Sequence, residues 1–251
     1  MRIGINPSAL YGMPNPKDAF GDMAKRGYHE FELWHVEPQV VSALAAAMKQ
    51  QDMRLSAFCT RCFELTAPAR RAEYLEGLRS ALVDAAVLGA RALITQVGAD
   101  TGADRAIQHE SIVQGIRASV PLLEAAGVTL LVEPLNIVKD HPGYYLWDSN
   151  EAFSLIREVD SPNVKVLYDV YHQLHMQEPV AERIQENLPL IGHFHVAGWP
   201  ARDDRLFEGF DHTALFRMIE KLPYKGLVGL ELFPRAGKLQ ELYGRLEAYR
   251  S

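Results

Sequence analysis

The sequence alternates eight times between short apolar runs and segments whose apolar residues recur at helical spacing. The runs are almost continuously apolar, which is typical of strands buried on both faces of a parallel sheet. They cover residues 2–6, 30–34, 55–59, 92–98, 128–134, 164–170, 191–197 and 226–232. Eight strand–helix units within 251 residues predict an α/β fold of the (β/α)8 TIM barrel type, as a single domain over residues 1–251.

The segments between the runs have recognisable helix ends. Helices are expected over residues 16–27, 38–51, 73–90, 111–127, 150–159 and 212–222. Gly27 and Gly89 stand where helices commonly stop, and Asp148 is an N-cap signal. A doubly wound open sheet is the alternative. It usually carries fewer strands and often a glycine-rich nucleotide turn, and the sequence contains neither GxGxxG nor GxxxxGK[ST].

Charge and hydropathy limit the classes of partner. The formal net charge is −6, and a basic footprint typical of nucleic-acid binding is not visible. No apolar run approaches the ~20 residues that span a bilayer, and the first residues lack the apolar core of a signal peptide. We therefore expect a cytoplasmic protein that acts on a small molecule. Cys59 and Cys62 are expected to be reduced thiols, because no second ligand pair follows them.

Ionisable residues stand at the ends of four successive predicted strands. The chemistry of a TIM barrel gathers where the strands end. The fifth to eighth strands bring Glu133, Asp169, His195 and Glu231 to that rim. Burying such groups costs several kcal/mol each unless they are paired or bind a metal. Three carboxylates and one imidazole therefore predict one divalent metal ion, Mn²⁺ or Mg²⁺ first, with Co²⁺ or Zn²⁺ also admissible.

The two glutamates suggest the reaction. They come from strands on opposite sides of the four-strand arc, so they would flank a substrate that chelates the metal. A metal that polarises a carbonyl acidifies the neighbouring C–H, and a flanking carboxylate can then remove the proton. Glu133 and Glu231 are accordingly the predicted acid and base of an enolising isomerase or epimerase.

Five motifs, in this order, resemble the hydroxypyruvate isomerase family. This family belongs to the xylose-isomerase-like TIM barrels, which also include ketose 3-epimerases and inosose dehydratases. The resemblance is strongest over residues 128–235. The motifs are VEPLN, PGYYL, SPNVKVLYDVYH, IGHFHVAGWPAR and GLVGLELFP.

The resemblance implies a metal held by the four rim residues, with both glutamates doubling as acid/base groups. It also implies that His172 binds a substrate oxygen and that Arg202 reaches the substrate beside the metal. The chain departs from hydroxypyruvate isomerases at His195, where they usually have glutamine, and at ARDDRL, which replaces their GRHEPG loop. The histidine at position 195 favours the epimerase and lyase branches, and the departures together argue against hydroxypyruvate itself as the substrate.

Other residues of the rim are weaker candidates. Trp34, Asn6 and His141 are predicted to contact the substrate. His193 shares a strand face with His195 but lies one layer deeper, where we expect a hydrogen bond within the barrel or to an acid. Two further histidines are expected at the surface, namely His175 and His212.

The leading hypothesis is a metal-dependent isomerase or epimerase of a sugar or small hydroxy-carbonyl compound, working through a metal-stabilised enediolate. The main alternative is a lyase on the same scaffold, either an inosose-type dehydratase or an enzyme that cleaves 3-oxo-glycosides or C-glycosides. A multi-zinc endonuclease for abasic sites and a non-catalytic sugar-binding module are further alternatives. A homo- or hetero-oligomer is compatible with each of them.

Overall fold

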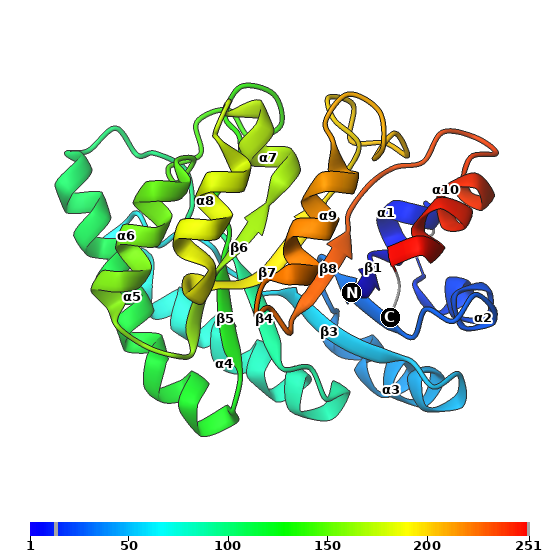
Figure 1. The fold of residues 1–251 in the computed structure, drawn as a ribbon. Coiled ribbons are helices and arrows are strands. Elements are labelled where there is room, and N and C mark those ends of the chain that lie inside the picture. The colour runs from blue at the N-terminus through cyan, green and yellow to red at the C-terminus, as the bar shows by residue number, and fades with distance from the viewer. Residues whose placement is uncertain (13–14, 250–251) are drawn as a thin grey trace.

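The computed structural model, which describes residues 1–12 and 15–249, is a closed barrel of eight parallel strands. Each strand pairs with its sequence neighbours, and β1 pairs with β8 to close the barrel (Figure 1). This confirms the predicted (β/α)8 fold. The strands are β1 (Arg2–Ile5), β2 (Glu30–Leu33), β3 (Arg54–Cys59), β4 (Ala92–Thr95), β5 (Thr129–Val132), β6 (Val164–Asp169), β7 (Ile191–Val196) and β8 (Leu227–Leu230).

Helices surround the strands (Figure 1). They are α1 (Pro7–Tyr11), α2 (Lys17–Lys25), α3 (Val41–Gln50), α4 (Arg71–Leu88), α5 (Arg105–Ala126), α6 (Ser149–Val159), α7 (Val170–His175), α8 (Val180–Asn187), α9 (His212–Lys221) and α10 (Leu239–Leu246). Short 3-10 turns also occur, at η1 (Pro38–Val40), η2 (Pro68–Arg70), η3 (Leu188–Leu190) and η4 (Glu247–Tyr249). Asp148 caps α6 as predicted, accepting hydrogen bonds from the backbone N–H groups of Asn150 and Glu151.

Several elements and bounds differ from the sequence-based expectation. Helices α1, α7, α8 and α10 were not predicted, and they span only five to eight residues each. Helix α5 begins at Arg105 instead of residue 111, because the Asp104 side chain caps it earlier. Strands β5 and β8 end at Val132 and Leu230, so Glu133 and Glu231 follow their strands directly.

The interior of the barrel is divided into an apolar and a polar half. Ala57, Ile94, Leu131 and Leu167, from β3 to β6, form a small apolar cluster separate from the main core. On the other side, β2 supplies the buried Glu32 and β7 the buried His193. Two glycines complete this side, Gly4 in β1 and Gly229 in β8, and both face the Glu32 carboxylate. A buried polar network therefore lies on the β7–β8–β1–β2 side of the barrel.

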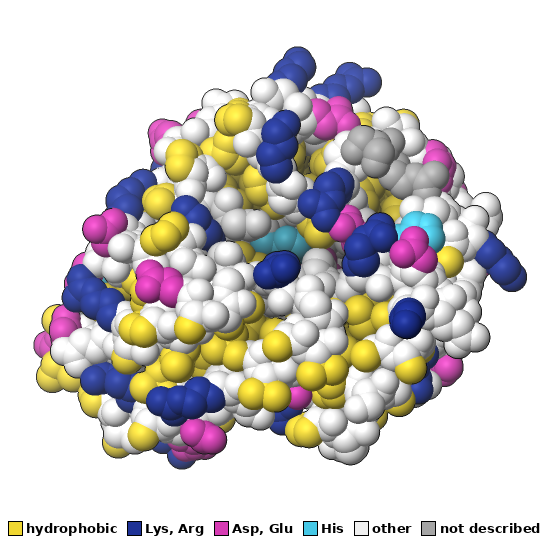
Figure 2. Space-filling view, turned by 90° about the horizontal axis from the view of Figure 1, so that it is seen from below, with side chains coloured by type: hydrophobic (Ala, Val, Ile, Leu, Met, Phe, Trp, Pro, Cys, Tyr) yellow, Lys and Arg dark blue, Asp and Glu magenta, His cyan; other side chains and the backbone are white. Residues whose placement is uncertain are grey.

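Within residues 1–12 and 15–249, no helix combines the length and apolar character needed to cross a bilayer. On the face drawn in Figure 2, Lys and Arg side chains are scattered among Asp and Glu side chains and apolar surface. They do not merge into a single basic area on that face.

Candidate active site

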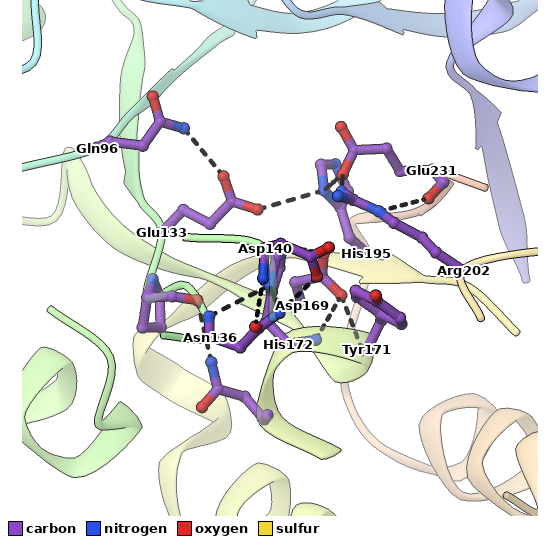
Figure 3. Close-up of polar contacts among 12 residues, drawn as sticks. Gln96, Glu133, Asn136, Asp140, Asp169, Tyr171, His172, His195, Arg202 and Glu231 are labelled. Atoms are coloured by element: carbon purple, nitrogen blue, oxygen red, sulfur yellow. Dashed lines mark hydrogen bonds and ion pairs between the residues drawn. The ribbon is translucent and has the colours of Figure 1, made fainter. Parts of the chain in front are cut away.

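The four rim residues predicted from the strand ends lie together. One ligand atom each from Glu133, Asp169, His195 and Glu231 lies within 4.8 Å of the others, and all four residues are buried. His195 Nδ1 is 3.6 Å from Glu133 Oε1 and 3.3 Å from Glu231 Oε2. Glu133 and Glu231 thus stand on either side of the same imidazole nitrogen (Figure 3).

A cavity of about 990 Å³ opens above this cluster. Of the nine site residues predicted from the sequence, Asp169 alone is not part of its wall. The others line it: Asn6, Trp34, Glu133, His141, His172, His195, Arg202 and Glu231. Sequence reasoning therefore located the cavity, although the role of each residue stays a prediction.

Each of the two flanking glutamates is oriented by its own hydrogen-bond donors. Gln96 Nε2 donates a 3.0 Å bond to Glu133 Oε2. On the other side, Arg202 Nη2 donates a 2.6 Å bond to Glu231 Oε2, and Trp34 Nε1 donates to Glu231 Oε1. One oxygen of Glu133 is thereby left facing the centre of the cluster.

His195 is bound on its other side by an acid. Its Nε2 lies 2.8 Å from Glu32 Oε2, which also lies 3.0 Å from His193 Nε2. The prediction that His193 sits below the rim and bonds to an acid is confirmed. By contrast, His195 Nδ1 is buried and has no hydrogen-bond partner among the described residues.

The cluster has an unusual electrostatic balance. Burial would lower the pKa of His195, but the charges of Glu32 and Glu231 outweigh it and raise that pKa well above the usual value. Burial raises the pKa of Asp169 to about 7 against the opposing charges of His195 and Arg202. For Glu231 the burial effect is overcome by His195 and Arg202, so its pKa is lowered. These buried carboxylates require positive charge between them.

Asp169 and His172 are joined by the start of α7. The Asp169 side chain caps this helix, accepting bonds from the backbone N–H groups of Tyr171 and His172. Its Oδ2 is 3.5 Å from His172 Nε2. Asn136 donates to His172 Nδ1 from its backbone N at 3.2 Å and from Nδ2 at 2.7 Å. His172 Nδ1 is therefore an acceptor, and the ring proton lies on Nε2.

The weaker candidates occupy the wall of the cavity. Trp34 is 36% exposed and reaches Glu231, while His141 lies with its ring centroid 5.3 Å from that of His172. Asn6 is partly engaged elsewhere, because its side chain accepts a bond from Ala9 N at the start of α1. Arg202 has a left-handed φ of 60°, and its backbone N donates to Gly198 O at 2.6 Å.

One surface expectation is wrong. His212 is fully buried rather than exposed, because it opens α9 and packs between Phe210 and Phe216. Sequence reasoning also missed Glu32 and Gln96 as parts of the site. In the stretch EFELW, Glu30 and Glu32 alternate with apolar residues, so the sequence did not single out Glu32 as a buried acid. Cys59 and Cys62 are both free, as expected.

Comparison with known proteins decides the family. The model of the xylose isomerase-like TIM barrel family matches residues 20–249. The chain belongs to this family. The resemblance inferred from the five motifs is thereby confirmed.

Two named relatives match two thirds or more of the chain. The chain is 27% identical to a 2-oxo-tetronate isomerase of Cupriavidus necator over 245 residues, which is 94% of each chain. It is 30% identical to the hydroxypyruvate isomerase of Escherichia coli over 169 residues, covering 67% of this chain and 65% of that one. A solved Brucella melitensis structure described as an AP endonuclease of family 2 covers 100% of both chains, with a TM-score of 0.92 and 26% identity.

Proposed function

We propose that this protein is a divalent-metal-dependent isomerase or epimerase that moves a proton next to the carbonyl of a hydroxy-ketone. The observation that carries the proposal is the pair of buried carboxylates, Glu133 and Glu231, on either side of His195 Nδ1 at the base of a large cavity. Two bases that flank one position suit removal of a proton and its return at another site.

The residues present fit a divalent ion. Four ligand atoms within 4.8 Å of one another match the spacing around a single ion with bonds of about 2.0–2.3 Å. The buried His195 Nδ1, which lacks a hydrogen-bond partner among the described residues, would gain one. Three carboxylates with one imidazole suit Mn²⁺ or Mg²⁺, and Co²⁺ or Zn²⁺ also accept this set. When bound, the ion would polarise the substrate carbonyl and stabilise the charge of the enediolate.

The protein side chains divide the proton transfers between two faces. One glutamate removes the proton, and the other supplies one to the neighbouring carbon in an isomerisation or to the opposite face in an epimerisation. Gln96 and Arg202 hold the two carboxylates in place, which preserves their aim at the substrate. The charge of Arg202 lowers the pKa of Glu231, so Glu231 suits the role of the ionised carboxylate that removes the proton, and the group that supplies one must enter the step protonated.

His172 would bind a substrate oxygen as a neutral donor. Burial lowers its pKa well below 6.5, and the charge of Arg202 acts in the same direction. Since Asn136 occupies Nδ1, the proton on Nε2 is available to a substrate hydroxyl or carbonyl. A neutral donor can bind that oxygen without itself giving up a proton.

The cavity favours an uncharged substrate of sugar size. Its volume of about 990 Å³ exceeds the needs of a three-carbon acid. Both arginines of its described lining are already paired, Arg202 with Glu231 and Arg61 with Asp84. Glu37 and Glu64 also line it. A substrate carboxylate would find no unpaired arginine on the described wall, so we favour a ketose over the 2-oxo acids named for the relatives.

A lyase is the second candidate, since His141 and His172 lie side by side near the substrate position. Expulsion of a leaving group needs a protonated acid. Burial lowers the pKa of both imidazoles, which keeps them neutral near pH 7. This favours isomerisation or epimerisation over elimination. Nucleic-acid cleavage is disfavoured by the net charge of −6.

Metal removal and substrate profiling test the proposal. The protein is stripped with a chelator, reloaded with Mn²⁺, Mg²⁺, Co²⁺ or Zn²⁺, and incubated with ketopentoses, ketohexoses, hydroxypyruvate and 2-oxo-tetronate. We expect metal-dependent conversion of a ketose to its isomer or epimer, detected by NMR. Unsaturated products would favour the lyase. Binding of sugar without turnover on any compound would favour a binding module.

A further inference from the structure

Glu32 lies at the centre of the polar half of the barrel, and the proposed reaction does not use it. The residue is 2% exposed and comes from the middle of β2. Its Oε2 accepts hydrogen bonds from both His193 and His195, at 3.0 and 2.8 Å. Its Oε1 has no partner among the described residues. A carboxylate buried in this way costs several kcal/mol unless its partners compensate it.

The neighbouring strands make room for this carboxylate. A Cβ added to Gly229 would lie 1.8 Å from Glu32 Oε1, and one added to Gly4 would lie 3.2 Å from the same atom. The absence of side chains at these two positions lets the carboxylate reach the imidazoles. The arrangement is therefore built from four strands, β1, β2, β7 and β8.

The two nitrogens of His195 have separate surroundings. Its Nε2 faces Glu32, and its Nδ1 faces Glu133 and Glu231. A carboxylate can only accept from a neutral imidazole, so the proton of the neutral ring resides on Nε2. The lone pair of Nδ1 is then directed at the predicted ion.

We propose that Glu32 is a positioning residue that sets the tautomer and ring orientation of His195 for metal binding, and that His193 holds Glu32 in place. This inference rests on the proposed function, because it assumes a metal bound by His195. Carboxylate partners of ligating histidines fix the ring and raise its basicity, and their loss typically weakens metal binding 10–100-fold.

The same three residues could instead bind a second ion, since their ligand atoms also lie within 4.8 Å of one another. We favour hydrogen bonding. Both imidazole nitrogens lie 2.8–3.0 Å from one oxygen of Glu32, which is hydrogen-bond spacing. A second ion would also require His195 to bridge two metals through both nitrogens. The number of metal ions bound per chain distinguishes a hydrogen-bonded Glu32 from a second ion site.

The test compares Glu32→Gln with Glu30→Gln, a matched control on the same strand whose carboxylate pairs with Arg2 away from the site. Zinc affinity is measured by competition with a chromogenic chelator. We expect one zinc ion per chain, about 10–100-fold weaker binding for Glu32→Gln, and unchanged binding for Glu30→Gln. Two ions per chain in the parent, or equal affinity in the two variants, would overturn the proposal.

A second pair of variants guards against misfolding of Glu32→Gln. His193→Leu removes the bond that holds Glu32, whereas His193→Gln retains an N–H donor. We expect weaker zinc binding for His193→Leu and recovery for His193→Gln, with folding checked by circular dichroism. Equal, parent-like affinity in both would contradict the role of His193.

Nitrogen-15 NMR of the zinc-loaded parent should show the His195 proton on Nε2, and a proton on Nδ1 would overturn the proposed tautomer. If the parent binds no divalent metal, both the proposed function and this inference fail. If the parent binds metal and Glu32→Gln binds it with the same affinity, this inference alone fails.

Discussion

Arg202, in the loop after β7, donates a 2.6 Å hydrogen bond to the carboxylate of Glu231, which follows β8. The arginine Nε also lies 3.4 Å from the backbone oxygen of Glu231. One guanidinium therefore fixes both the side chain and the backbone of a predicted acid/base group. Lysine cannot reproduce such a two-point contact, because its charge is a single point on a flexible stem.

We expect Arg202→Lys to lower kcat about 10–100-fold, because the Glu231 carboxylate would lose its fixed aim at the substrate. The loss should be larger in kcat than in zinc affinity. The control is Arg205→Lys, since Arg205 pairs with Asp203 in the same loop and does not contact Glu231. Similar kcat losses in the two variants would argue that loop structure, rather than the contact with Glu231, is responsible.

Gly229→Ala should destabilise the protein strongly. The new methyl group would lie 1.8 Å from Glu32 Oε1 and 2.8 Å from His195 Cδ2, and overpacking of this kind costs about 1–3 kcal/mol or more. Urea unfolding monitored by circular dichroism measures the change. Gly21→Ala is the control, because a Cβ there has no neighbour within 4 Å and the residue lies within α2. That variant should gain about 0.5–1 kcal/mol. If Gly229→Ala leaves the free energy of unfolding unchanged, the Glu32 carboxylate can move to make room for the methyl group.

His212 should make stability depend on pH. Burial lowers its pKa to about 4, below the value of about 6.5 in an unfolded chain. The unfolded state then binds more protons between pH 6.5 and 4, so the free energy of unfolding falls as the pH is lowered through this window. The contribution of this residue is about 3 kcal/mol.

His212→Phe should retain the packing against Phe210 and Phe216 and remove this dependence. The measurement is the difference in unfolding free energy between variant and parent at pH 7 and pH 4.5. The control variant is His35→Gln, because His35 is exposed and its replacement should leave the pH dependence of unfolding unchanged. If the pH dependence of His212→Phe equals that of the parent, this residue is not the source.

The barrel and the place of its cavity could be predicted from the sequence, because both follow from the repeated strand–helix unit. Eight apolar runs predict eight strands, and the rule that barrel chemistry lies at strand ends selects Glu133, Asp169, His195 and Glu231. The four were brought together as expected. Their distance along the chain did not matter, because the barrel places the ends of successive strands side by side.

The parts that were missed depend on contacts across the barrel. In EFELW, acidic and apolar residues alternate. From the sequence alone, Glu32 therefore looks like an acid on the solvent-exposed face of a strand. Only the closure of the barrel shows that Gly4 and Gly229 leave room for it. Gln96 was expected within a strand over 92–98, but β4 ends at Thr95, and its contact with Glu133 is set by the loop that follows.

Exchange of the substrate proton with solvent tests the central claim most directly. The metal-loaded protein is incubated in D₂O with the ketose that it converts, and NMR locates the deuterium. We predict deuterium on the carbon that receives the new proton, which is the neighbouring carbon in an isomerisation and the same carbon in an epimerisation. Exchange should stop on metal removal and should slow about 10²–10⁴-fold in Glu133→Gln or Glu231→Gln. Conversion of the ketose without deuterium uptake, or with undiminished uptake in both variants, would contradict proton transfer by these two glutamates.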